Sequence, residues 1–387
     1  MKKLFSTSLF MLIYSLILFT GCSEDELPDS IPEKDDYTID LPIELSEKEY
    51  TTDNTYYLLN DDEPDEVYFN SSQRSFYVNR PLQLSLEEEL YFQLRFYSPR
   101  SISHVTIWAK IEGYDEDFKF LELEKVQPFQ QLRIQIPFAT KDMKAISRSG
   151  KQIRIIANPH LSASNISFEV ECNDPYYQKI TSSLCNWRIY FSGYSGEGSW
   201  KYKLLPPHAR EAVAIALNMS YMFSSEAFEE ALHEFGPLHS DSNKTLIDKY
   251  QLRKRVLNHS GLRFGHCSGV NGLGGGETYG LNEWCYLEHY VDDKNETHTV
   301  FHELAHCIGY GHDGNMTYEQ TGPGWITLCA NVYRALSLAK ELPVYSRRFM
   351  HTRKNPNRYN KNDLNVPSKY IIEDPELDLL DGGLTQK

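Results

Sequence analysis

Three histidines and one glutamate share a short stretch whose spacing suits metal chemistry. The motif H-E-x-x-H-x-x-G-x-x-H runs from His302 to His312. Histidines four positions apart lie on the same face of a helix, so His302 and His306 could bind one zinc ion. Glu303 would lie beside the metal without binding it, in position to take a proton from a zinc-bound water. Gly309 could adopt the left-handed conformation that ends a helix and so return His312 as the third ligand.

A structural zinc site is the alternative interpretation of these histidines. Structural sites usually close the coordination with four protein ligands and favour cysteine, whereas three histidines leave a fourth position to water, as in catalytic sites. The motif therefore favours Zn²⁺ as a hydrolytic cofactor. A cell-surface binding lipoprotein with a structural or vestigial zinc site is the competing hypothesis.

The eleven-residue motif resembles the signature of the metzincin zinc endopeptidases. That family carries a methionine in a tight turn beneath the zinc site, and residues 315–318, Asn-Met-Thr-Tyr, resemble this turn. The turn follows His312 sooner than in the better-known subfamilies, and Met350 lies at a more typical distance. The resemblance implies a zinc-dependent endopeptidase with Met316 in the turn. It also implies that Tyr318 is an extra zinc ligand or a hydrogen-bond donor to the transition state; a packed aromatic ring is the alternative.

The resemblance also implies how a substrate would bind. In metzincins an edge strand shortly before the zinc helix pairs antiparallel with the extended substrate, so that backbone pairing accepts many peptide sequences. The segment 278–290 is rich in Tyr, Leu and Trp and is predicted to be a strand, with Gly280 and Leu281 at that edge. The glycine-rich segment 272–276 is predicted to be a flexible loop, and it lacks the G-K-[ST] ending of a phosphate-binding loop.

The first 22 residues predict a targeting segment. Lys2 and Lys3 precede an apolar stretch that is too short for a comfortable transmembrane helix, and Thr-Gly-Cys at 20–22 follows as a cleavage site. This site resembles a bacterial lipobox, which implies a lipid anchor on Cys22; an ordinary secretory signal is the alternative. The acidic run at 23–26 resembles signals for the outer face of the outer membrane. We therefore expect a lipoprotein of the bacterial cell envelope, anchored to the outer membrane and facing outward.

Composition and charge limit the classes of partner. A formal net charge of −15 argues against nucleic-acid binding, which needs basic patches. We expect a monomer that acts on a peptide or protein substrate. Six cysteines besides Cys22 suggest disulfides in an exported chain. Local pairing is our expectation, and buried thiols are the alternative. The expected pairs are Cys172–Cys185, Cys267–Cys285 and Cys307–Cys329.

Hydrophobic patterning predicts an α+β chain with two folded regions. After the signal segment (1–22) and a flexible acidic tether (23–40), residues 41–175 are expected to form an immunoglobulin-like β-sandwich. Residues 186–345 are expected to form a metzincin-like catalytic domain with a mixed sheet, a backing helix and the zinc helix, followed by a C-terminal tail at 346–387. Short alternating runs predict the sandwich strands. These runs are 105–111, 118–123, 132–136, 151–155 and 166–170.

The catalytic region has its own sequence of expected elements. A first strand is predicted at 187–191, and a long core helix is predicted to start at Pro206 and to continue through Leu232. A short helix is expected within 240–258. Asp293 and Glu296 could cap a zinc helix that begins near residue 297, and a last helix is predicted at 326–342.

Overall fold

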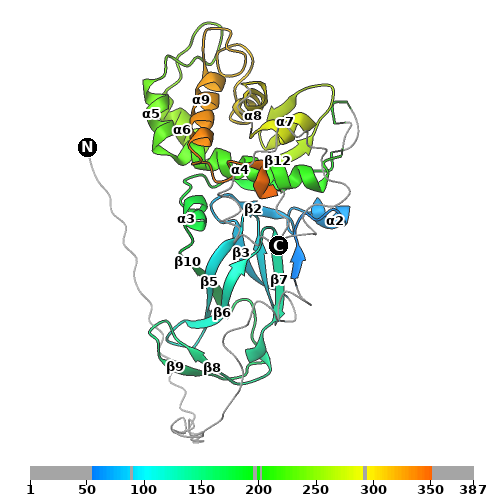
Figure 1. The fold of residues 1–387 in the computed structure, drawn as a ribbon, viewed down its shortest axis with the longest axis vertical. Coiled ribbons are helices and arrows are strands. Elements are labelled where there is room, and N and C mark those ends of the chain that lie inside the picture. Colours follow the sequence, from blue (N-terminus) through cyan, green and yellow to red (C-terminus); the bar gives the residue numbers. More distant parts are fainter. Residues whose placement is uncertain (1–54, 88–89, 195–197, 201–202, 291–293, 351–387) are drawn as a thin grey trace, which may run out of the picture. The chain divides into compact units, whose positions relative to one another are not determined.

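The computed structural model describes residues 55–87, 90–194, 198–200, 203–290 and 294–350. They form a mixed α+β fold with several small antiparallel sheets and one mixed five-stranded sheet accompanied by helices (Figure 1). The predictions for the signal segment with Cys22, the tether, Asp293 and the tail beyond residue 350 lie outside the described residues. Among the described helices, none combines the length and the apolar character that crossing a bilayer requires.

The N-terminal half is built from antiparallel strands. One sheet has the order β1-β7-β4-β3, a second has the order β10-β5-β6, and β8 pairs with β9. The strands are β1 (Thr55–Tyr57), β3 (Leu82–Glu87), β4 (Tyr91–Phe96), β5 (Ile102–Ile111), β6 (Phe118–Val126), β7 (Gln130–Gln135), β8 (Met143–Ile146), β9 (Gln152–Ile155) and β10 (Ile166–Cys172). All five alternating runs of the sequence coincide with these strands to within one residue at their ends, which confirms those predictions.

The four-stranded and the three-stranded sheet of the N-terminal half share an apolar layer. Successive side chains of a strand point to opposite faces, and along β7 buried residues alternate with more exposed ones. Phe92 on β4 packs against Phe120 on β6 and Phe168 on β10, with ring centroids 5.1 and 4.8 Å apart. The antiparallel sheets therefore face each other through aromatic contacts. An immunoglobulin-like strand connection stays a prediction.

The second half contains the mixed five-stranded sheet. Its order is β13-β14-β12-β11-β2, in which β11, β12 and β14 are parallel and the outer strands β13 and β2 are antiparallel to their neighbours. The strands are β2 (Ser75–Tyr77), β11 (Arg188–Phe191), β12 (Gly261–His266), β13 (Gly272–Gly275) and β14 (Thr278–Leu281). Strand β2 comes from the N-terminal half of the chain, so this sheet draws on both halves.

Helices accompany the sheets. They are α2 (Asp65–Tyr68), α3 (Pro175–Thr181), α4 (Pro206–Ser224), α5 (Glu226–Glu234), α6 (Lys249–Leu257), α7 (Glu283–Glu288), α8 (Lys294–Cys307) and α9 (Trp325–Leu338), with 3₁₀ turns η2 (Pro137–Ala139) and η3 (Arg347–Met350). Helix α4 packs against α5, α7 and α9, and α8 packs against α9 (Figure 1). Helix α8 also packs against β13. The predicted zinc helix, the short helix α6 and the last helix α9 are all present.

Two element boundaries differ from the predictions. The core helix does not continue to Leu232: Ser225 is extended, and its hydroxyl accepts the Phe228 N–H as the N-cap of a new helix, α5. The predicted strand 278–290 is also too long. Strand β14 ends at Leu281, and α7 starts at Glu283 and buries Tyr286.

The six cysteines in the described part of the chain form no disulfide, so the three predicted pairs are wrong. All six side chains are buried as thiols. Five of them donate to backbone carbonyls, at sulfur–oxygen distances of 3.3–3.8 Å. A buried thiol behaves as a small apolar group with a weak hydrogen-bond donor. In these five cysteines the S–H group is satisfied by a backbone carbonyl, so no disulfide partner is needed. Burial raises the pKa of Cys185, Cys267 and Cys307 to about 12, which keeps these groups protonated.

Candidate metal centre

Helix α8 and the turn after it bring the three histidines together. His302 and His306 lie one turn apart on α8. Gly309 then has a φ of +92°, its N–H donates to the carbonyl of His306, and the N–H of Tyr310 donates to the carbonyl of Ala305. This pair of bonds is the Schellman arrangement that ends helices. The predicted role of Gly309 is therefore confirmed.

The imidazole nitrogens converge on one point. The Nε2 atoms of His302 and His306 are 3.1 Å apart, and those of His306 and His312 are 2.9 Å apart. Ligand nitrogens of the three residues all lie within 4.8 Å of one another. A tetrahedral zinc ion with Zn–N bonds of about 2.0–2.1 Å holds its nitrogens about 3.4 Å apart. The donor set therefore fits a zinc ion held by three Nε2 atoms.

Backbone carbonyls orient two of the rings. Nδ1 of His302 donates to the carbonyl of Thr317 at 3.2 Å, and Nδ1 of His306 donates to the carbonyl of Tyr310 at 2.7 Å. With the proton on Nδ1, the lone pair of Nε2 is available to a metal. Burial lowers the pKa of His302 to about 4 and lowers that of His306, so both rings are neutral at neutral pH, as metal binding requires.

The segment that carries Met316 and Tyr318 lies against this cluster. Met316 is buried, and the carbonyl of Thr317 accepts from His302. The Tyr318 ring lies 4.7 Å from the His302 ring and 4.5 Å from the His312 ring, and the residue is 60% exposed. Met350, the other methionine that could form the turn, is buried at the end of η3. Tyr318 is therefore a largely exposed side chain beside two of the three clustered histidines.

Glu303 is buried between α8 and the edge strand β13. Its exposed fraction is 5%, and burial raises the pKa of its carboxyl to about 7, an effect that the Gly274 N–H partly offsets by donating to it. A Cβ on Gly272 would lie 2.4 Å from Glu303 Cγ, and a Cβ on Gly274 would lie 2.3 Å from the Glu303 carbonyl oxygen. The two glycines thus allow β13 to approach the helix directly over the glutamate.

The location predicted for the edge strand is wrong. Gly280 and Leu281 lie on β14, which pairs with β12 on one side and with β13 on the other, so they are internal to the sheet. The edge is β13, the segment predicted to be a flexible loop. Glycine is unfavourable in strands in general, but here contact with Glu303 of α8 leaves no space for a side chain at positions 272 and 274. The glycines at alternate positions, 272 and 274, were the signal in the sequence that could have identified this strand.

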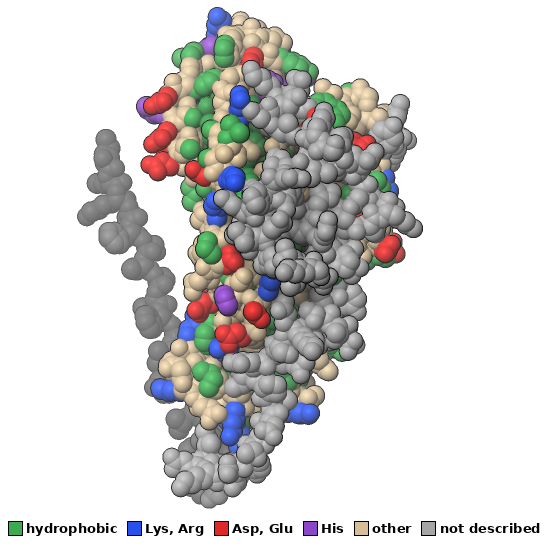
Figure 2. Space-filling model, viewed as in Figure 1, with side chains coloured by type: hydrophobic (Ala, Val, Ile, Leu, Met, Phe, Trp, Pro, Cys, Tyr) green, Lys and Arg blue, Asp and Glu red, His purple; other side chains and the backbone are tan. Residues whose placement is uncertain are grey.

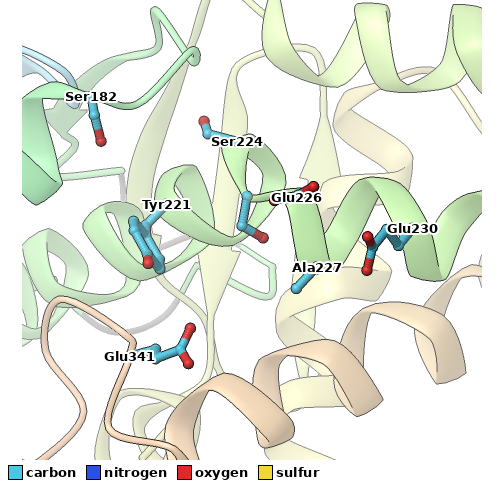
Figure 3. A pocket seen from close by; sticks show the side chains of 8 residues that line it. Ser182, Tyr221, Ser224, Glu226, Ala227, Glu230 and Glu341 are labelled. Atoms are coloured by element: carbon cyan, nitrogen blue, oxygen red, sulfur yellow. The ribbon is translucent and has the colours of Figure 1, made fainter.

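A pocket lies apart from these residues. A pocket of about 520 Å³ is formed where α4 meets α5, and acidic side chains gather near α5 on the surface (Figures 2 and 3). Its lining residues are Ser182, Tyr221, Ser224, Ser225, Glu226, Ala227, Glu230 and Glu341. None of these residues belongs to the histidine cluster, so the pocket takes no part in the proposed metal chemistry.

Comparisons with protein-family models, with curated proteins and with solved structures found no match to this chain. A function must therefore be inferred from the geometry of the three histidines and Glu303. Together they could hold a metal ion and place a buried carboxyl group, whose pKa is raised by burial, one residue from a ligand. This combination suits a hydrolytic reaction in which a base near neutrality accepts a proton.

Proposed function

We propose that this protein is a zinc-dependent endopeptidase of metzincin-like architecture. The observation that carries the proposal is the convergence of three Nε2 atoms, with a buried carboxyl group on Glu303, the residue that follows His302. Strand β13 supports it further, because an antiparallel edge strand lies directly against the histidine-bearing helix. Such an edge can pair with an extended peptide of varied sequence.

Each residue has its own role in the proposed reaction. His302, His306 and His312 would hold Zn²⁺, which when bound supplies Lewis acidity by lowering the pKa of a water and polarising the scissile carbonyl. Glu303 takes a proton from the attacking water and later gives it to the leaving amine, so no net proton remains on the enzyme. Tyr318, whose ring lies beside two of the histidines, donates a hydrogen bond to the developing oxyanion.

Metal analysis and a peptide library test the proposal. We expect one zinc per chain and cleavage of internal peptide bonds in a diverse library. Cleavage should stop when a chelator removes the metal and return when zinc is restored, since three ligands alone hold the ion. Stoichiometric zinc without cleavage of any peptide would instead favour the binding lipoprotein with a structural site.

Substitution of Gly272 is expected to impair hydrolysis without loss of metal. In Gly272→Ala the new Cβ would lie 2.4 Å from Cγ and 2.5 Å from Oε1 of Glu303, so the carboxyl group must move. Misplacing a catalytic group by about 1 Å can lower the rate about 100-fold. Kinetics of peptide cleavage and zinc content measured on the same preparation check this expectation.

Gly236→Ala is the matched control, because a Cβ there meets no atom within 4 Å. It should keep both zinc and activity. Full activity of Gly272→Ala would show that the close approach of β13 does not position Glu303.

We also propose that the protein is anchored through Cys22 to the outer membrane and faces outward. The apolar segment and the small residues before that cysteine support this location. Labelling with a fatty-acid analogue, compared between the native chain and Cys22→Ser, tests the anchor. Equal label in both would exclude lipidation at this cysteine.

A further inference from the structure

We infer that Asn315 is a positioning residue for the metal centre, which it serves by fixing the loop that carries His312 and Tyr318. The inference rests on the proposed zinc site. Asn315 lies three residues after His312, and its side-chain hydrogen bonds involve none of the three clustered histidines, so it acts through the backbone of the loop. No regular helix or strand holds residues 308–324, so other contacts must define where this loop lies.

The Asn315 side chain uses each of its hydrogen-bonding atoms on a backbone group. Its Oδ1 accepts the His239 N–H at 2.6 Å, and its Nδ2 donates to the carbonyls of Pro237 and Pro323, each at 3.0 Å. The residue is 1% exposed. The Asn315 side chain therefore links the loop at residues 308–324, the metal loop, to the segment before α6. It also bonds to Pro323 at the end of the same loop, just before α9.

The Asn315 backbone completes the same junction. Its N–H donates to the carbonyl of His239 at 3.2 Å, and its carbonyl accepts the Trp325 N–H at 3.0 Å. The backbones also touch directly: a Cβ on Gly314 would lie 2.1 Å from the carbonyl oxygen of His239, and a Cβ on Gly324 would lie 1.7 Å from that of Asn315. Side chains are thus excluded on both sides, and the loop has little freedom to shift here.

The segment to which Asn315 binds is itself braced. His239 and Leu246 form an antiparallel bridge, and the Ile247 N–H donates to the carbonyl of Leu238 at 2.9 Å. The His239 ring also contacts the Thr321 hydroxyl at 3.1 Å through Nδ1. A short hairpin therefore serves as a fixed support for the metal loop.

The supporting hairpin acts on the metal site through two residues close to Asn315 in the sequence. Three residues before Asn315 lies the ligand His312, and two residues after it lies Thr317, whose carbonyl orients His302. If Asn315 lost its contacts, the loop could shift and loosen one ligand and the orientation of another at once. Groups that orient metal ligands typically contribute about 10–100-fold to metal affinity.

The test is Asn315→Asp in the full chain. Aspartate keeps the acceptor for His239 but replaces the two donor bonds with a carboxylate oxygen facing two carbonyl oxygens. We expect zinc to bind about 10–100-fold more weakly in competition with a chromophoric chelator, with an unchanged circular dichroism spectrum. The absorption of the cobalt-substituted variant should also change, because its bands report the ligand geometry. Asn243→Asp, on the exposed turn of the supporting hairpin, is the matched control and should bind zinc as the native chain does.

A second variant covers the case in which Asn315→Asp does not fold. Thr321→Val removes only the hydroxyl that contacts His239 and should weaken zinc binding severalfold. Native zinc affinity and an unchanged cobalt spectrum in a folded Asn315→Asp chain, or native affinity in Thr321→Val if the first variant does not fold, would overturn the inference. Because these measurements need no turnover, they remain informative even if the protein cleaves no peptide.

Discussion

Glu303→Gln is expected to reduce peptide hydrolysis by about 10²–10⁴-fold, the usual contribution of a positioned general base. Glutamine has nearly the same shape and can still accept the Gly274 N–H, so the packing between α8 and β13 should persist. An amide, however, cannot take the proton of the attacking water. The three histidines are unchanged, and zinc content should therefore stay at the native level.

The measurement is kcat/KM on the best peptide of the library, together with zinc content and a thermal melt. Glu230→Gln is a suitable control, since Glu230 is an exposed residue of α5 that lines the separate pocket. It makes the same chemical change and should leave kcat/KM unaltered. If Glu303→Gln hydrolysed peptides at the native rate, Glu303 would not be the base.

Removal of the N-terminal half is expected to prevent the second half of the chain from folding. A chain of residues 186–387 lacks β2, which pairs with β11 in the five-stranded sheet. It also lacks Tyr68, whose ring stacks on Phe191 at 5.9 Å. Loss of these groups leaves β11 as a bare edge and exposes apolar surface. Domains are stable by only about 5–15 kcal/mol, so the loss of a strand and its packing is decisive.

Urea unfolding of two chains that end at the same residue, 186–387 and 41–387, tests this expectation. The longer chain should unfold in a cooperative transition, and the shorter one should aggregate or show none. A cooperative, zinc-binding chain of residues 186–387 would instead show that the second half folds alone.

A buried ion pair between the two halves allows a finer comparison. Arg210 on α4 donates to Asp61 at 2.9 Å, and both side chains are 1% exposed. Asp61→Ala would leave a buried arginine without this partner, and the free energy of unfolding should fall by about 3–5 kcal/mol. Asp65→Ala is the matched control, because the Asp65–Lys203 pair is exposed and surface pairs contribute about 0–1 kcal/mol.

The histidine cluster was predictable because its main determinants are local. The i, i+4 spacing places His302 and His306 on one helical face, and a glycine after the helix permits the left-handed turn toward His312. The backbone carbonyls of Tyr310 and Thr317 that orient two of the rings escaped prediction. Every residue has a carbonyl, so its use as a hydrogen-bond acceptor leaves no trace in residue type.

Strand patterns were likewise predictable where one face is buried. The alternating runs from 105 to 170 all became strands, because burial on one face of a sheet demands a period of two. The segment 272–276 was misassigned for the opposite reason. Glycines are poor strand formers, and only the approach of α8 makes Gly272 and Gly274 necessary.

The amino-acid sequence by itself determined the histidine triad, the neighbouring glutamate and the α+β character, since each depends on spacing within a few residues. Tertiary structure alone decided which strand forms the sheet edge, that β2 joins the second sheet, that the cysteines stay thiols and that Asn315 secures the metal loop. These features depend on atoms brought together from distant parts of the chain. Spacing along the sequence carries no direct record of such contacts, because they form only when the core packs.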